Sequence, residues 1–286
     1  MSAALFPDAL ERSSAIEIDQ GDYDLAKTRF RGLLAGDTVP PTGFAFASIT
    51  PSAPPSFPQV FSRAFVAPFS QSFSGTVLEP TVDGCRGGGI YAVRPPAEDP
   101  LPLFIGAPHR GADRLTGTIT YRLFLERNPA AAAWNSIPRR ADGECGQGGS
   151  DIAHIRRHFF TAFSSAFAEA YPAGRVVQIH GFDVNRRTTA PARASAVILS
   201  GGTDRVTPAV QAVGDCLKVE LPNHPVLLFP VDTQELGART NTQGQALRSA
   251  GFGGFVHVEL SLAFRQELAG DASLRAQLGQ CLEAGL

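Results

Sequence analysis

Two histidines and one aspartate occupy positions from which they could bind a metal ion. His109 and Asp113 occur in IGAPHRGADRLTG, which follows an apolar segment and precedes a segment with helical spacing. His180 ends a second apolar segment, RVVQIHG, and Gly181 comes directly after it. Catalytic zinc sites use three protein ligands, and imidazole and carboxylate are suitable ones. Gly181 has no side chain, so backbone or substrate could approach His180 closely. Simpler roles also fit: a hydrogen-bonded histidine at a strand end, and Asp113 as a helix cap.

Glu259 could take a proton from the water that attacks a substrate. It lies in GGFVHVELSLAFR, where alternation places Phe255, His257 and Glu259 on one face of a strand and the apolar residues between them on the other. A carboxylate in such a strand is costly to bury unless it is used or paired. A general base therefore accounts for Glu259, and so does a salt bridge to Arg265 or Arg248.

Five further polar residues could contact a substrate. Arginine binds carboxylates through two parallel hydrogen bonds. Arg139 ends WNSIPR, with Asn135 nearby, and Arg248 precedes the strand just described. Asn241, in TNTQG, could also face the site, and His154 lies near the start of a predicted helix. For either arginine, a solvated surface position is the simpler interpretation.

His154 and His158 share one face of a helix predicted over residues 151–170, with Ser150 as its N-cap. Their spacing is that of the HExxH zinc motif. However, Ile155 stands where that motif requires glutamate, and no third ligand follows. We therefore interpret His154 as a secondary site residue, which could reach either a substrate or a carboxylate behind the site, rather than as a metal ligand.

The elements that must position these residues alternate between strand and helix. Strands are predicted over 88–95, 101–108, 130–136, 175–181, 194–202, 224–231 and 254–261, and helices over 114–127, 151–170, 205–217 and the C-terminus. The first two strands are predicted to form a hairpin. This order favours a three-layer α/β sandwich with a mostly parallel or mixed central sheet. Ligands bind at the carboxyl ends of the strands in such folds, which is where His109 and His180 lie.

Residues 1–80 form a predicted N-terminal part, and residues 81–286 the predicted hydrolytic α/β domain. DYDLAKTRFRGLLAG favours a short helix that stops at Gly36. The remainder is rich in proline, serine and phenylalanine, and we expect an irregular arm packed on the main body. The phenylalanines expected to be buried are Phe44, Phe46, Phe57, Phe61, Phe65, Phe69 and Phe73.

The composition limits the possible partners. Hydrophobic residues make up 43% of the 286 residues and charged residues 18%, so a large core is possible. With a net charge of -2 and no lysine or arginine block, no nucleic-acid partner is expected. No apolar run is long enough to cross a bilayer, so no membrane association is expected. The expected partner is a small-molecule or peptide-like substrate.

The cysteines favour an extracytoplasmic location, although MSAALFPDALERSS lacks the basic start and apolar core of a signal peptide. The four are Cys85, Cys145, Cys216 and Cys281. An even number permits two disulfides, which persist in oxidising compartments. Spacing alone leaves their pairing open.

The order of the motifs resembles a known family. The stretches APHRGAD, WNSIPRR, VVQIHGFD, VILSGGTD and TNTQGQALRSAGFGGFVHVELSLAFR follow one another as in the poly-γ-glutamate hydrolases of phage and bacteria, which are similar to zinc carboxypeptidases in fold. The resemblance covers roughly residues 88–268. It implies that His109, Asp113 and His180 are zinc ligands and that Glu259 is the general base. Asp113 departs from the family pattern, which commonly has glutamate at a somewhat different spacing.

We therefore expect a zinc-dependent hydrolase that cleaves an amide bond in a carboxylate-bearing, peptide-like substrate, such as a γ-glutamyl compound. Two alternatives stay open. One is an amidohydrolase of small N-acyl amino acids, which substrate size would distinguish. The other is a catalytically silent ligand-binding module on the same fold, which metal content would distinguish.

Overall fold

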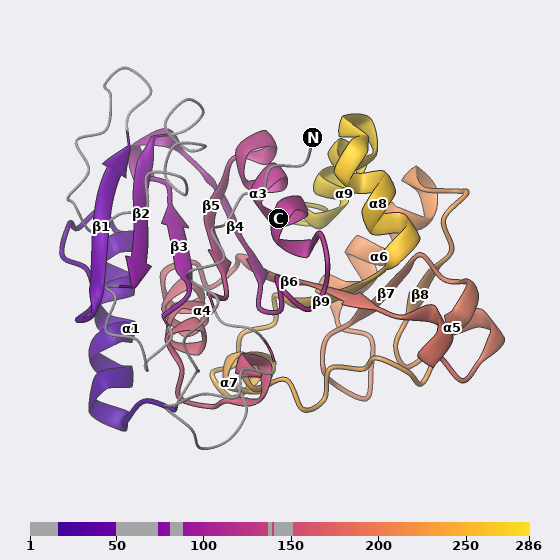
Figure 1. Cartoon of the computed structure of the whole chain (residues 1–286), viewed down its shortest axis with the longest axis horizontal. Coiled ribbons are helices and arrows are strands. Elements are labelled where there is room, and N and C mark those ends of the chain that lie inside the picture. The colour runs from indigo at the N-terminus through magenta and orange to yellow at the C-terminus, as the bar shows by residue number, and fades with distance from the viewer. Residues whose placement is uncertain (1–16, 50–73, 81–87, 137–138, 140–150) are drawn as a thin grey trace.

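The computed structural model describes residues 17–49, 74–80, 88–136, 139 and 151–286 (Figure 1). Within these residues the strands form one nine-stranded sheet in the order β1-β2-β3-β5-β4-β6-β9-β7-β8. The strands are β1 (Phe44–Ile49), β2 (Gly75–Pro80), β3 (Ile90–Val93), β4 (Leu101–Ala107), β5 (Pro129–Trp134), β6 (Arg175–Phe182), β7 (Val197–Ser200), β8 (Val226–Leu228) and β9 (Phe255–Ser261). Strands β5, β4, β6 and β9 are mutually parallel, and β7 runs antiparallel to β9.

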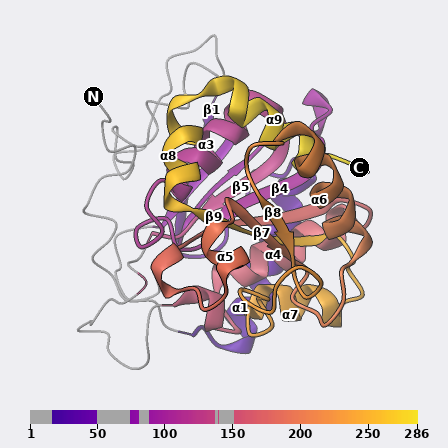
Figure 2. The same ribbon diagram turned by 90° about the vertical axis from the view of Figure 1, so that its right-hand side faces the viewer.

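Helices cover both faces of the sheet (Figures 1 and 2). The helices are α1 (Gln20–Leu34), α3 (Thr116–Arg127), α4 (Phe159–Ala170), α5 (Ala190–Ala194), α6 (Pro208–Glu220), α7 (Thr242–Ser249), α8 (Leu262–Gly270) and α9 (Ala272–Leu282). One core, under α3, α6, α8 and α9, contains Val177 and Val258. The other, under α1, α4 and α7, contains Val176 and Phe255. The predicted three-layer α/β sandwich is confirmed.

The N-terminal part contributes to the sheet, which corrects the expectation of an irregular arm. β1 pairs with β2 and β2 with β3, all antiparallel, so strand pairing crosses the boundary predicted at residue 80. The predicted helix forms as α1, where the Asp19 side chain accepts a hydrogen bond from the backbone N–H of Asp22. Phe44 is buried and Phe46 packs against the same core. The other five phenylalanines predicted to be buried lie outside the described residues.

The predicted hairpin of the first two strands is wrong. β3 and β4 are separated in the sheet by β5, which pairs antiparallel with β3 and parallel with β4. The chain leaves β4, passes through α3 and returns as β5, and such a crossover makes neighbouring strands parallel. The four alanines of β5, all buried, give this strand two narrow faces that fit between its neighbours.

The single helix predicted over residues 151–170 is also wrong. The chain forms a short 3₁₀ turn, Ile152–His154, and then α4. Each has its own N-cap, because the Asp151 side chain accepts from the N–H of Ala153 and His158 Nδ1 accepts from the N–H of Phe160. His154 and His158 therefore do not share a helix face. The predicted cap, Ser150, lies outside the described residues.

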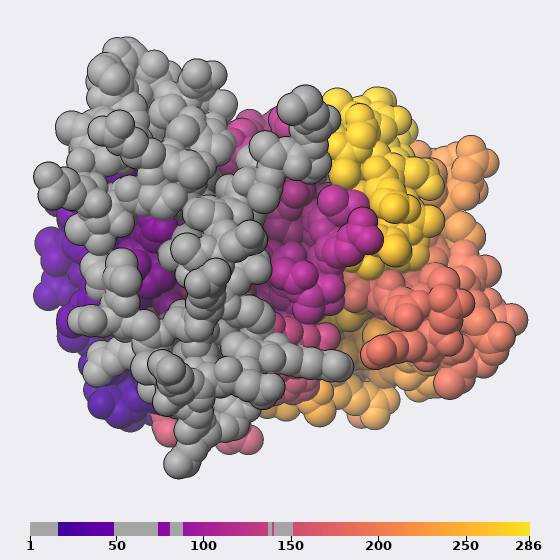
Figure 3. All heavy atoms as spheres, in the orientation of Figure 1, coloured from indigo at the N-terminus to yellow at the C-terminus, as the bar shows by residue number. Residues whose placement is uncertain are grey.

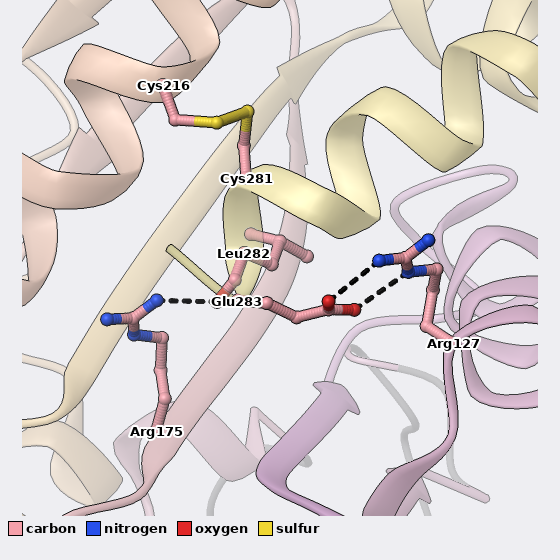
Figure 4. The surroundings of a disulfide bond; sticks show 6 residues. All are labelled: Arg127, Arg175, Cys216, Cys281, Leu282 and Glu283. Atoms are coloured by element: carbon pink, nitrogen blue, oxygen red, sulfur yellow. Dashed lines mark hydrogen bonds and ion pairs between the residues drawn. A yellow bond between two sulfur atoms is a disulfide. The ribbon is translucent and has the colours of Figure 1, made fainter. Parts of the chain in front are cut away.

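Figure 4 shows three of the interactions that attach the C-terminal helix α9 and the residue after it to the rest of the fold. A disulfide joins Cys216 of α6 to Cys281 of α9. Arg127 and Glu283 form two parallel hydrogen bonds of 2.7 Å, and Arg175 Nη1, at the start of β6, donates to the Leu282 carbonyl at 2.6 Å. In the space-filling view α8 and α9 (yellow) lie beside the magenta segment that leads into α3 (Figure 3). Cys85 and Cys145 lie outside the described residues.

No helix within the described ranges is both long and apolar enough to span a membrane.

Candidate metal centre

Three side chains from two strand ends converge on one point. His109 and Asp113 come from the loop after β4, and His180 comes from β6. The Nδ1 atoms of His109 and His180 are 3.1 Å apart, and Asp113 Oδ2 lies 3.5 Å from the first and 3.6 Å from the second. A tetrahedral zinc ion with ligand distances of about 2.0–2.1 Å needs ligand atoms about 3.3–3.4 Å apart. The triangle therefore has the size that zinc requires.

Asp151 fixes the orientation of His109. Its Oδ1 lies 2.7 Å from His109 Nε2, and its Oδ2 accepts from Arg139 Nε at 2.8 Å. A carboxylate can only accept at neutral pH, so Nε2 carries a proton and Nδ1 presents a lone pair to the triangle. A carboxylate behind a metal-binding imidazole is the usual way in which proteins orient such a ligand.

A chain of buried amides fixes His180 in the same way. The backbone N–H of Gly244 donates to Asn241 Oδ1, which leaves Asn241 Nδ2 to donate to Gln178 Oε1 at 2.7 Å. Gln178 Oε1 is therefore an acceptor, and it lies 3.3 Å from His180 Nε2. His180 must then carry its proton on Nε2, so Nδ1 presents its lone pair toward His109 and Asp113. Gln243 closes the chain by accepting from Gln178 Nε2 at 3.3 Å.

Gly181 leaves room at the strand end for an arginine side chain. A Cβ atom at this position would overlap the guanidinium of Arg265, which packs against the backbone there. Arg265 donates to the carbonyls of Leu260, Phe182 and Arg114. The N–H of Gly181 donates to Asp113 Oδ2 at 3.0 Å and so holds the third member of the triangle. The group that closely approaches the glycine after His180 is thus the side chain of Arg265, and not the backbone or substrate that the sequence suggested.

Glu259 lies beside the triangle because of strand register. β6 and β9 pair in parallel with His180 opposite Glu259 and Gln178 opposite His257. Four polar side chains therefore lie together on the α4-facing side of the sheet, those of Gln178, His180, His257 and Glu259. They follow the apolar pair Val176 and Phe255 along the two strands. The predicted alternation is confirmed, because Val256, Val258 and Leu260 pack in the opposite core.

The suggested salt bridges do not account for Glu259. Within the described part of the chain, Glu259 Oε2 is buried and has no hydrogen-bond partner. Arg265 donates to backbone carbonyls, and Arg248 Nη1 donates to the carbonyl of Gly201 at 3.2 Å. Glu259 Oε1 lies 3.9 Å from His257 Nε2. The carboxyl group is thus available to a molecule bound beside the triangle.

Burial and neighbouring charges perturb the pKa values of these groups. Burial, reinforced by the negative charge of Asp113, raises the pKa of Glu259 to about 8. Burial lowers the pKa of His180 to about 4. For His109, burial lowers the pKa, but hydrogen bonds to Asp113 and Asp151 outweigh it and the net shift is upward. Burial acts to raise the pKa of Asp113, yet the two histidines hold it far below its usual range. A positive charge, either a proton on His109 or a cation, is therefore favoured within the triangle.

These groups line a pocket of about 210 Å³. Of the residues predicted to contact substrate, three line it: Arg139, His154 and Asn241. Arg139 and His154 stand at the side that holds Asp151, with side chains 38% and 48% exposed. Asn241 is buried and forms part of the amide chain behind His180.

The structure does not bring the other two predicted substrate contacts, Asn135 and Arg248, into this pocket. Asn135 is buried, its backbone N–H donates to the carbonyl of Ala107 and its own carbonyl accepts from Arg110. Arg248 packs against the turn at Gly201 and Gly202. Neither belongs to the described residues that line the pocket. Both were predicted from nearness in sequence to a strand end, which does not determine the side-chain direction.

The sequence did not single out three important residues. Gln178 and His257 could have been found, because each lies two positions before a candidate residue and therefore on the same face of its strand. Asp151 had no such signal. It was hidden in the predicted helix, and its contact with His109 joins residues 42 positions apart.

Comparison with known proteins gives limited likenesses. No family model and no curated protein matches the sequence. N-formylglutamate amidohydrolase from Ralstonia eutropha JMP134 is 14% identical over 64% of this chain and 92% of its own, with a TM-score of 0.41. A variant of the cell shape determinant protein Csd4 from Helicobacter pylori is 14% identical over 63% and 49%, with a TM-score of 0.39.

A metallo-carboxypeptidase from Burkholderia cenocepacia is 11% identical over 93% of this chain and 68% of its own, with a TM-score of 0.37. At these identities and TM-scores the likenesses carry no information about the activity of this chain. The function is therefore inferred from the geometry of the site.

Proposed function

We propose that the protein is a zinc-dependent hydrolase that cleaves an amide bond in a carboxylate-bearing, peptide-like substrate, such as a γ-glutamyl compound. One observation carries the proposal. The ligand triangle of His109, Asp113 and His180 lies in the same pocket as Glu259, whose Oε2 has no hydrogen-bond partner among the residues that the structure describes. The three triangle residues fit zinc in donor type and spacing, and the tautomers of the two histidines are fixed. Bound zinc would supply a Lewis acid that polarises a substrate carbonyl and acidifies a water molecule.

Glu259 is suited to move the proton in this reaction. It would accept a proton from the attacking water and donate it to the departing amine, which otherwise leaves as an unstable anion. Its raised pKa shows how strongly the site disfavours an isolated negative charge. A positive charge in the triangle would oppose this effect and favour the ionised form, which can accept the proton.

Arg139 is suited to hold a substrate carboxylate. Its guanidinium lies at the pocket, is partly exposed and is paired with one oxygen of Asp151. Guanidinium has five donors, so it can bind a second carboxylate without leaving Asp151. Asp151 also contacts His109. Only the side chain of Asp151 would therefore separate a substrate carboxylate bound at Arg139 from the proposed metal ligand His109.

The size of the pocket favours a second candidate substrate, a small N-acyl amino acid. Its volume of about 210 Å³ lies below the roughly 300–1,000 Å³ of pockets that enclose drug-sized ligands. A single acyl amino acid requires less space than a peptide. Activity on N-acyl amino acids, together with inactivity on γ-glutamyl peptides, would favour this candidate.

The test combines metal analysis with a substrate panel. We expect about one tightly bound zinc ion in protein purified without a histidine tag, and hydrolysis of γ-glutamyl peptides or N-acyl amino acids. Glu259→Gln should keep zinc and lose at least about 10²-fold in kcat, because the amide cannot accept a proton. A Glu259→Gln variant with near-normal turnover would exclude the proton role. Bound zinc without any turnover would favour a silent binding module.

We also propose an extracytoplasmic location. The disulfide between Cys216 and Cys281 supports it, because disulfides persist mainly in oxidising compartments. Trapping of free thiols in protein from its native host would show these two cysteines unmodified if the proposal is correct.

A further inference from the structure

His257 has no role in the proposed reaction, yet it occupies an unusual position. Its ring is buried, stacks on the ring of His180 with centroids 4.3 Å apart, and lies beside Glu259 in the pocket. Within the described residues, His257 Nδ1 and Glu259 Oε2 are both buried and both lack a hydrogen-bond partner. An unpartnered buried polar atom costs about 1–3 kcal/mol. The other nitrogen of His257, Nε2, lies 3.9 Å from the carboxyl group of Glu259. A buried carboxyl group with one unpartnered oxygen, beside an imidazole nitrogen in the same pocket, indicates a place where a ligand is bound.

The two residues belong to a second triad that overlaps the first. His180, His257 and Glu259 offer ligand atoms that all lie within 4.8 Å of one another. The triad is wider than the first, since the distance between His257 Nε2 and Glu259 Oε1 is 3.9 Å. His180 belongs to both triads. Its Nε2 faces Gln178 and carries the proton, so Nδ1 is the one nitrogen that it can offer to an ion in either triad.

We propose that His257 and Glu259 form a second, weaker position for a divalent cation, adjacent to the first triad. When the first triad is filled, His180 Nδ1 is in use and the second ion has two protein ligands, which makes it weak. When the first triad is disrupted, His180 becomes free and the second triad has three ligands. Imidazole with carboxylate suits zinc and similar transition metals rather than magnesium or calcium, which prefer oxygen ligands.

A consequence of this position rests on the proposed function. An ion held by Glu259 occupies the carboxylate that must accept the proton of water. Hydrolysis should therefore rise as the first equivalent of zinc is added and fall as the second position fills. The protein would then be active only within a window of zinc concentration, and His257 would set its upper limit.

The experiment is a titration of chelator-stripped, tag-free full-length protein with zinc alone, followed by calorimetry. The wild type should show two events, the second at least about 10-fold weaker. His257→Gln and His257→Phe should lose the weaker event and keep the stronger one; the phenylalanine keeps an aromatic ring against His180. His109→Ala should still bind one ion, and His109→Ala with His257→Gln should bind at least about 10-fold more weakly than His109→Ala. Circular dichroism establishes that each variant is folded.

His224→Gln is the matched control. His224 Nε2 lies 2.8 Å from Glu267 on the surface, so this pair offers the same two ligand types away from the pocket. It should titrate like the wild type. Loss of the weaker event in His224→Gln, or its retention in both His257 variants, would overturn the proposal. The titration decides this even if no substrate is ever hydrolysed. If a substrate is hydrolysed, the ratio of rates at one and at excess equivalents of zinc should approach one in the His257 variants.

Discussion

Replacing Glu259 with glutamine should stabilise the metal-free protein at alkaline pH and change its stability little near about pH 4.5. Burial, with the charge of Asp113, raises the pKa of Glu259 from 4.5 to about 8. Between these values the unfolded chain carries an ionised Glu259 while the folded protein keeps the proton. The unfolded state then binds fewer protons, so the stability of the wild type falls as the pH rises. Glutamine has no charge to bury and removes this fall.

The size of the effect follows from the shift. One pKa unit corresponds to about 1.36 kcal/mol, so a rise from 4.5 to about 8 corresponds to roughly 5 kcal/mol once Glu259 is fully ionised. The side chain is 11% exposed to the pocket, and water there reduces the cost. We therefore expect the variant to be more stable than the wild type by about 2–3 kcal/mol at about pH 8.5, and by less than about 0.5 kcal/mol at about pH 4.5.

Urea unfolding in the presence of a chelator, at several pH values, measures this difference as a change in midpoint at constant slope. Glu267→Gln is the control, because its carboxylate is 52% exposed and its removal tests the loss of one surface charge. The reasoning is refuted if the difference between Glu259→Gln and the wild type is independent of pH or decreases as the pH rises. Added zinc should reduce the difference at high pH, because a nearby cation favours the ionised carboxylate.

Three further predictions concern the support of the site and the stability of the fold. Gln178→Leu should bind zinc about 10–100-fold more weakly in a competition assay. In ¹⁵N NMR spectra of the metal-free variant, the population of the Nδ1–H tautomer of His180 should increase, and an unchanged population would contradict the role of the amide chain. Cys216→Ser should lower the free energy of unfolding by about 4 kcal/mol, the loop-entropy value for a disulfide between residues separated by 65 positions. Equal urea midpoints for the variant and the wild type would show that the crosslink does not restrict the unfolded chain. Gly181→Ala should lower stability by about 1–3 kcal/mol and weaken zinc binding, because its Cβ would overlap Arg265; a variant with wild-type unfolding and zinc affinity would refute that steric requirement.

The sequence by itself determined the features that depend on local pattern. The α/β class followed from apolar runs alternating with helical spacing, because each strand or helix must bury one face. The alternation of side chains along β9 predicted that Glu259 points to the opposite face of the sheet from Val258 and Leu260, and the structure shows these two residues in the opposite core. His109 and His180 were found because each ends an apolar strand, and the carboxyl ends of parallel strands lie at one edge of the sheet.

Tertiary structure alone decided the features that depend on contacts between distant segments. β5 lies between β3 and β4, so these two strands do not form the predicted hairpin. The register of β6 with β9 places His180 opposite Glu259 and Gln178 opposite His257. Asp151 reaches His109 only because the chain breaks the predicted helix there and caps a separate turn. Periodicity tells which face of an element a residue occupies. It does not tell which element lies beside that face, since strand order and register are set by the burial of all faces together.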